Sequence, residues 1–197
     1  MRKERYEWVQ SWCDEADEEG ARVLLIGDSI TRGYEKMVRE RLRGVCRVDY
    51  LSTSYAADMP IFGELVRSFV KDSRYDVIHF NHGLHGWDMS PETYKRCLKE
   101  LFLSLEWRGS LILATTTFVY EVGGDRPNVE QNKAVTERNA VVRELAKEFG
   151  CAIDDLFPVS LNMDKSKRNF DGTHYEEAGS QELADNVAAS ILKALKK

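Results

Sequence analysis

Short apolar runs alternate with longer amphipathic segments along most of this chain of 197 residues. Each run is rich in Val, Ile and Leu and has the length of one buried strand, and a segment of helical periodicity follows each of the first four runs and, after a long connection, the fifth. Such an order predicts a parallel sheet with helices on both faces, because right-handed crossovers leave few other topologies. We therefore predict an α/β fold with a doubly wound, five-stranded parallel sheet. The expected strands lie at 21–27, 45–51, 75–81, 110–117 and 151–153, and the expected helices at 34–43, 60–72, 91–107, 129–149 and 175–195, with one more helix before the first strand.

Length and composition fit one globular domain. No repeat, low-complexity stretch or linker marks a boundary, so residues 1–197 are expected to form a single domain. Apolar residues make up 43% of the chain and charged residues 31%, which is ordinary for a soluble protein. The net charge of -5 argues against nucleic acid as a partner. No apolar run approaches the length that spans a membrane, so no membrane partner is expected either.

The start of the chain and its cysteines indicate a compartment. The first twenty residues are basic at the beginning but have no apolar stretch behind them, so they do not form a signal peptide. The four cysteines include no Cys-x-x-Cys pair and are expected to be reduced thiols. These features predict a cytoplasmic protein, whereas its oligomeric state does not follow from the sequence. No phosphate loop or dinucleotide fingerprint is present, so no cofactor is expected.

The most specific local motif is Gly27-Asp28-Ser29, which follows the apolar run VLLI directly. A serine at the end of a strand, entering a turn and then a helix, places its hydroxyl at the carboxyl edge of the sheet. The same turn exposes backbone N–H groups that can receive a developing negative charge. A second interpretation is purely structural, because either Asp28 or Ser29 could act as a helix N-cap.

A second motif, Asp171-Gly172-Thr173-His174, precedes the last expected helix. A histidine here could take the proton from Ser29 and later return it as a general acid. Asp171 could accept a hydrogen bond from the other ring nitrogen and so fix the tautomer. The structural alternatives are an N-cap for Asp171 and a partly buried surface histidine for His174.

Together the two motifs resemble those of the GDSL/SGNH hydrolase family. The order of elements is similar from about residue 22 to about residue 190, although the motifs themselves are short. The resemblance implies a flavodoxin-like, three-layer α/β/α fold. It also implies ester hydrolysis in which Ser29 is the nucleophile, His174 the base and Asp171 the group that orients it.

The family also has an oxyanion hole, whose first donor would be the backbone N–H of Ser29. Its members usually present a glycine after the second strand, but this chain has no glycine between Gly44 and Gly63. A backbone N–H of the segment 52–54 (Ser52, Thr53 or Ser54) is expected to substitute. A side chain at this place would narrow the site and favour a small acyl group.

After the third strand the family usually has Gly-x-Asn-Asp, in which the asparagine is another oxyanion donor. Here the chain reads Asn81-His82-Gly83-Leu84-His85-Gly86. Alignment on the glycine selects His85, and alignment on the asparagine selects Asn81. We prefer Asn81, because a neutral amide always offers donors whereas an imidazole does so only in the right tautomer or when charged.

Three histidines, His79, His82 and His85, follow one another at a spacing of three. This spacing does not place them on one face of a strand, because side chains alternate with a period of two. No cysteine or carboxylate cluster accompanies them, so no metal site is expected. His79 is expected to lie in the core of the sheet.

Residues that follow strand ends are candidates for a substrate pocket, although packing of loops onto the sheet would explain them equally well. Two long connections, 118–128 and 154–174, also emerge at this edge and suggest functional loops. The first contains two glycines and a proline and is expected to be mobile; whether it acts as a lid does not follow from the sequence. The pocket candidates are Asp28, Tyr34, Trp87 and Tyr120, with Met59, Phe62 and Phe118 as weaker ones.

These residues predict a serine esterase that hydrolyses small acyl esters, such as O-acetyl esters of a carbohydrate or another small metabolite. A lysophospholipase or thioesterase is the enzymatic alternative, although no contiguous apolar segment requires a long acyl groove. A catalytically degenerate member of the fold that only binds a ligand is the second alternative. A flavodoxin-like regulatory or flavin-binding domain is the third, but it leaves the pairing of Ser29 with His174 unexplained.

Overall fold

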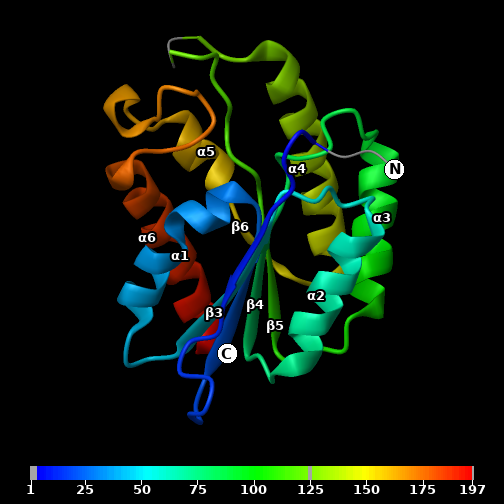
Figure 1. Cartoon of the computed structure of the whole chain (residues 1–197), viewed down its shortest axis with the longest axis vertical. Coiled ribbons are helices and arrows are strands. Elements are labelled where there is room, and N and C mark those ends of the chain that lie inside the picture. The colour runs from blue at the N-terminus through cyan, green and yellow to red at the C-terminus, as the bar shows by residue number, and fades with distance from the viewer. Residues whose placement is uncertain (1–3, 124–125, 197) are drawn as a thin grey trace.

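A single twisted sheet forms the centre of the molecule, and helices pack on both of its faces (Figure 1). The computed structural model describes residues 4–123 and 126–196. Along the sheet the strands follow the order β1-β3-β2-β4-β5-β6. Their bounds are β1 Val9–Trp12, β2 Arg22–Gly27, β3 Arg47–Thr53, β4 Val77–Asn81, β5 Ser110–Ala114 and β6 Ala152–Asp154.

The five strands β2 to β6 are parallel, as the sequence predicts. Numbered among themselves, they run in the order second, first, third, fourth, fifth, which is the flavodoxin-like order. The direction of winding changes between β2 and β4. In open sheets of this kind, ligands bind beyond the carboxyl ends of the strands at such a switch point.

The segment before β2 differs from the expected helix. Val9–Trp12 forms the edge strand β1, which pairs antiparallel with β3, so the sheet has six described strands rather than five. All four of its residues are exposed, so no buried side chain marks the strand in the sequence. Its ladder of backbone hydrogen bonds to β3 holds it in place, and this long-range pairing overrides local helical periodicity.

The helices form two outer layers. Consecutive residues of β2 point to opposite faces, so Leu24 and Ile26 pack into one apolar cluster and Val23 and Leu25 into the other. The first cluster includes buried residues of α2, α3 and the second half of α4, and the second includes buried residues of α1, α5 and α6. The helix bounds are α1 Ser29–Leu42, α2 Pro60–Asp72, α3 Pro91–Ser104, α4 Val129–Phe149, α5 Leu156–Leu161 and α6 Glu177–Leu195.

The connections also refine the expectations from the sequence. The helix α1 begins at Ser29, five residues before its expected start. The segment 154–174 is not free of regular structure, because it contains α5 and the short 3₁₀-helix η1 (Lys165–Lys167). In 118–128, residues 124–125 lie outside the described residues, so the expected mobility of this loop stays a prediction. No helix in the described ranges is long and apolar enough to cross a bilayer.

Candidate active site

The two sequence motifs meet at the carboxyl edge of the sheet, where β2 ends. The strands β2 and β4 lie side by side there, with Gly27 opposite Asn81 in the register. Gly27 is required for this approach, because an added Cβ would overlap the hydroxyl of Thr31 and the carbonyl oxygen of Asn81. The absence of a side chain therefore lets the chain turn from β2 directly into α1.

The hydroxyl of Ser29, at the first residue of α1, lies next to the imidazole of His174. Ser29 Oγ is 2.8 Å from His174 Nε2, although 145 residues separate the two in the chain. On the other side of the ring, His174 Nδ1 is 2.6 Å from Asp171 Oδ2. The structure thus places a hydroxyl, an imidazole and a carboxylate in one continuous hydrogen-bonded chain.

Asp171 also holds the turn that carries it. Its Oδ1 accepts hydrogen bonds from the backbone N–H groups of Thr173 and His174, both at 2.8 Å. Partial burial acts to raise the pKa of Asp171, but the hydrogen bonds from His174 and Thr173 outweigh it, so the pKa of this carboxyl is lowered. Asp171 is therefore a carboxylate at neutral pH and remains one into moderately acidic solution.

The turn that carries Asp171 and His174 is hydrogen-bonded to the segment that follows β5. The backbone N–H of Tyr120 donates to Gly172 O, and that of Gly123 donates to Phe170 O, both at 2.8 Å. Gly172 has a φ of 77°, and a Cβ at this position would overlap the carbonyl oxygens of Tyr120 and Glu121. A glycine is therefore needed where this turn passes the segment 118–128.

Asp28 has a structural role and does not line a pocket. Its side chain is fully buried, and Oδ1 caps α1 by accepting from the N–H of Ile30 at 3.0 Å. Its Oδ2 accepts from the N–H groups of Gly83 and Leu84, both at 3.1 Å. The pocket prediction for Asp28 is wrong, because both oxygens are used to fasten the loop after β4 to the start of α1.

Asn81 and Tyr34 are also unavailable to a substrate. Both side chains are fully buried, and the Asn81 amide donates to the hydroxyl of Tyr34 at 3.2 Å. Burial raises the pKa of the Tyr34 hydroxyl, which stays neutral. The preference for Asn81 as an oxyanion donor is therefore wrong, and so is the placement of Tyr34 in a pocket. Both side chains lie in the interior, where they are hydrogen-bonded to each other.

In the segment 52–54, polar groups of Thr53 and Ser54 are hydrogen-bonded to the N-terminal segment, residues 4–8. Ser54 N–H donates to the carbonyl of Trp8 at 3.2 Å, and the Thr53 hydroxyl donates to the same carbonyl at 2.8 Å. Ser52 lies within β3, paired with Gln10 on one side and Gly27 on the other. The prediction of an oxyanion donor at Ser54 is wrong, because β1 and the residues before it take up this edge.

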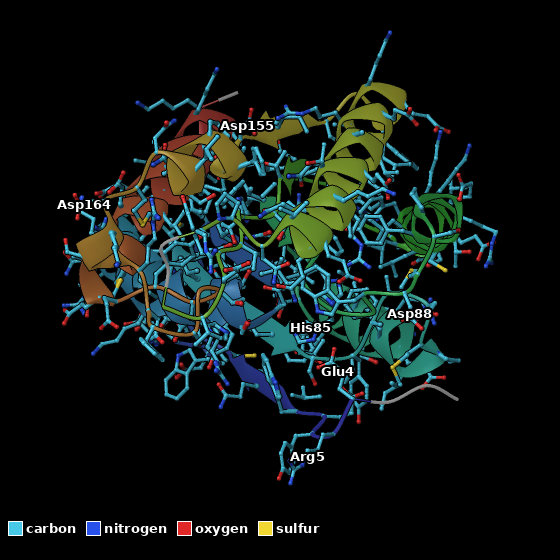
Figure 2. All side chains as sticks on the ribbon, turned by 90° about the horizontal axis from the view of Figure 1, so that it is seen from above. Glu4, Arg5, His85, Asp88, Asp155 and Asp164 are labelled. Atoms are coloured by element: carbon cyan, nitrogen blue, oxygen red, sulfur yellow. The ribbon has the colours of Figure 1, made fainter. Side chains whose placement is uncertain are left out.

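His85 is the other candidate from the loop after β4, and it lies against the N-terminal segment. Its Nδ1 is 2.9 Å from a carboxylate oxygen of Glu4, and its side chain is 12% exposed. The ring of Trp8 meets the imidazole edge-on, with the centroids 6.4 Å apart. Figure 2 shows Glu4 beside His85 at this edge of the molecule. Neither Glu4 nor Trp8 was expected near the site, because the N-terminal segment was predicted to be a helix.

Arg138 is a further residue that the sequence analysis did not single out. The residue is 2% exposed, and its guanidinium donates to the carbonyl oxygens of Gly83 at 2.7 Å, His85 at 2.9 Å and Gly86 at 2.5 Å. Arg138 therefore fixes the loop that presents His85. Its spacing from the buried Val135 and Val142 is the signal that places it on the inner face of α4.

Replacing Arg138 with Met is expected to lower the free energy of unfolding by about 3 kcal/mol, because three loop carbonyls lose charged donors inside the protein. Urea unfolding measures this change. Arg143→Met is the matched control on the same helix, because Arg143 is exposed and, among the described residues, pairs with Asp155 in a surface ion pair, for which a loss below about 1 kcal/mol is expected. Equal losses in the two variants would contradict the role of Arg138.

Two other pocket predictions have different outcomes. Trp87 lines a cavity of about 180 Å³ between the N-terminal segment and the loop after β4. Tyr120 is 8% exposed, donates its hydroxyl to Leu161 O at 3.2 Å and lies under the guanidinium of Arg168. Its ring therefore packs the segment after β5 and does not line this cavity. Met59 also lines the cavity, whereas Phe62, on the inner face of α2, is buried in the core.

The remaining histidines lie in the interior. His79 is fully buried in β4, as expected, with Nε2 2.9 Å from Asp154 Oδ2. Burial lowers the pKa of His82 to about 4, so this ring is neutral at physiological pH, with Nε2 3.0 Å from Tyr55 O. In residues 4–123 and 126–196 no group of three His, Cys, Asp or Glu side chains has the arrangement of a metal site.

No protein-family model and no curated protein sequence matches the chain. Solved structures do match its fold. An acetylxylan esterase from Geobacillus stearothermophilus superposes with a TM-score of 0.69 and 18% identity, over 87% of this chain and 94% of that one. The inhibitor-bound aryl esterase of M. smegmatis gives a TM-score of 0.71 at 14% identity, over 89% and 100% of the two chains.

A third similar structure is a protein from Slackia heliotrinireducens whose assignment as an SGNH hydrolase is provisional. It has a TM-score of 0.64 and 19% identity, over 88% of this chain and 100% of that one. At these identities the likeness concerns the fold. The chain has the three-layer α/β/α fold of SGNH-type esterases.

Proposed function

We propose that the protein is a serine esterase with Ser29 as nucleophile, His174 as general base and Asp171 as the residue that orients the base. The observation that carries the proposal is the hydrogen-bonded chain from Ser29 Oγ through the His174 ring to Asp171. Asp171 accepts from Nδ1, so Nε2 is left with the lone pair that a serine proton needs. Both ring and carboxylate are about half exposed, so a substrate can reach them.

The reaction proceeds in two steps. Ser29 Oγ bonds to the ester carbonyl carbon while its proton passes to His174 Nε2, and the tetrahedral intermediate then expels the alcohol, which takes that proton. Water next gives a proton to His174 and attacks the acyl-enzyme. Breaking the bond to Ser29 Oγ releases the acid and returns the proton to the serine. The charge on the imidazolium is balanced by Asp171 in both steps.

The oxyanion needs donors that are not already occupied. The backbone N–H of Ser29 lies at the N-terminus of α1, where the helix dipole favours negative charge. His85 is the side chain we propose as a second donor, since the Asn81 amide is bonded to Tyr34. The loop that carries His85 is fastened to the residue before Ser29 through Asp28, which supports its place at the site.

As substrates we propose small acyl esters, such as the O-acetyl ester of a carbohydrate or another small metabolite. The cavity beside the N-terminal segment, about 180 Å³, is smaller than the roughly 300–1,000 Å³ of common ligand pockets. Trp87, Glu4 and Glu7 are among the residues that line it, and its small volume favours a short acyl group over a long acyl chain. The similar acetylxylan esterase makes an acetyl ester a natural first choice.

A series of p-nitrophenyl esters from acetyl to octanoyl tests the substrate class. We expect kcat/KM to be highest for acetyl and to fall by about tenfold or more by octanoyl, because a small cavity cannot desolvate the added methylenes and steric overlap offsets their transfer energy. Steady-state kinetics at matched detergent-free conditions give these values. A kcat/KM that rises steadily with chain length would favour a lysophospholipase or thioesterase instead.

A fluorophosphonate probe tests the nucleophile without knowledge of the natural substrate. We expect one covalent adduct on Ser29 in the wild type, identified by peptide mass spectrometry, and none in Ser29→Ala. Heat-denatured protein is the control for nonspecific labelling. A folded wild type that stays unlabelled and hydrolyses no acetyl ester would instead support a binding protein of the same fold.

A further inference from the structure

We propose that Glu4 is a positioning residue for His85 and orients this imidazole as the second oxyanion donor. The proposal rests on the proposed function and extends it to the N-terminal segment, residues 4–8. Glu4 is the residue that holds the ring, since its carboxylate oxygen lies 2.9 Å from His85 Nδ1. Among the described residues, no hydrogen-bond partner is found for the buried Nε2 on the other side of the ring.

The N-terminal segment is anchored well enough to hold the ring. The backbone of Trp8 makes two hydrogen bonds to Ser54. Its N–H donates to Ser54 Oγ at 2.8 Å, and its carbonyl accepts from Ser54 N–H. The Ser54 hydroxyl in turn donates to the Glu7 carboxylate at 2.7 Å, and Glu4 N–H donates to the same side chain at 2.8 Å. These contacts fix the backbone at both ends of the segment.

The same segment connects His85 to the helix that carries Ser29. The ring of Trp8 packs edge-on against the His85 imidazole. The guanidinium of Arg32 lies over the same Trp8 ring, 4.5 Å from its centroid. Arg32 is three residues after Ser29, in the first turn of α1. The imidazole therefore packs against a segment that also contacts the first turn of α1.

The chemistry of the pair decides which hydrogen bonds the ring can make. A carboxylate only accepts, so the proton of Nδ1 points at Glu4. A ring that also donates from Nε2 carries both protons and a positive charge, which the Glu4 carboxylate balances. Hydrogen bonds with a charged partner are roughly twice as strong as neutral ones, so such a ring is a stronger oxyanion donor than the family's asparagine.

A double-mutant cycle tests this role. Glu4→Gln removes the charge at nearly constant size, and we expect kcat for p-nitrophenyl acetate to fall about tenfold with KM changed less than about twofold. Glu4→Asp, which keeps the charge, should recover part of the loss. In a His85→Asn background the donor is a neutral amide, so Glu4→Gln should change kcat by less than about twofold.

Arg5→Gln is the matched control, because Arg5 is the neighbouring charged residue and points away from the site in Figure 2. It should leave kcat within about twofold of the wild type. An equal loss from Glu4→Gln in the wild-type and His85→Asn backgrounds would overturn the inference, because Glu4 would then act independently of His85.

A spectroscopic readout separates this inference from the proposed function. The ¹⁵N signals of the His85 ring, assigned by their loss in His85→Asn, should move in Glu4→Gln and stay unchanged in Arg5→Gln. Unmoved signals in Glu4→Gln would overturn the role of Glu4 whether or not the enzyme turns over. If Ser29→Ala instead hydrolyses acetyl ester at the wild-type rate, the proposed esterase mechanism fails, and the ring signals still decide the Glu4 contact.

Discussion

Ser29→Ala is expected to lower kcat for p-nitrophenyl acetate by about 10⁶-fold, to near the limit of detection. The variant lacks the only atom that would form the acyl-enzyme, while its helix start is kept because Asp28, not Ser29, supplies the cap of α1. A stopped assay with purified protein and a measured uncatalysed rate gives the residual activity. Thermal unfolding should show a midpoint close to that of the wild type.

Ser166→Ala serves as the control for this variant, because Ser166 is an exposed serine in η1 whose hydroxyl, among the described residues, bonds to Asp164. It should retain full activity. Equal rates for wild type and Ser29→Ala would end the claim that Ser29 is the nucleophile. A loss shared by both serine variants would point to damage of the fold.

Asp171→Asn is expected to lower kcat by about 10⁴-fold. The remaining oxygen of the side chain can still accept from the N–H groups of Thr173 and His174, so the turn is kept. The new amide, however, offers a donor to His174 Nδ1, and the ring then needs its proton on Nε2. In that tautomer the ring cannot accept the proton of Ser29.

Asp164→Asn is the matched control for Asp171→Asn, since Asp164 also accepts a backbone N–H two residues on, from Ser166 at 2.8 Å, and lies in the same long connection. It should leave kcat within about twofold of the wild type. An Asp171→Asn variant with near wild-type kcat would show that His174 does not depend on Asp171 for its tautomer. Crystallography or ¹⁵N spectra of the ring would identify the tautomer directly.

The parallel sheet and the main helices could be predicted because their signals are local. Each central strand is buried on both faces, so its run of Val, Ile and Leu is visible without knowledge of its neighbours. The edge strand β1 could not be predicted in this way. Its residues VQSW are all exposed, and what makes them a strand is their pairing with β3, some forty residues away.

The same distinction applies to the site. Ser29 and the pair of Asp171 and His174 lie in short motifs at defined element ends, and the fold brings them to hydrogen-bonding distance. The oxyanion donors were harder to predict, because a polar group can serve as a donor only if no other group in the folded protein already bonds to it. Asn81 pairs with Tyr34 across the interior, and Ser54 pairs with Trp8 from a segment expected to be helical.

The backbone hydrogen bonds between the segment 118–128 and the turn that carries Asp171 and His174 restrict how this fold can be altered. The backbone N–H of Tyr120 bonds to Gly172 O, and that of Gly123 bonds to Phe170 O. Because these are main-chain hydrogen bonds, a new side chain elsewhere cannot substitute for them once the backbone of this segment is changed. A swinging motion of this segment would carry the histidine away from the serine. Engineering of substrate range by loop grafting should therefore spare residues 120–123 and exchange the residues around Trp87 instead.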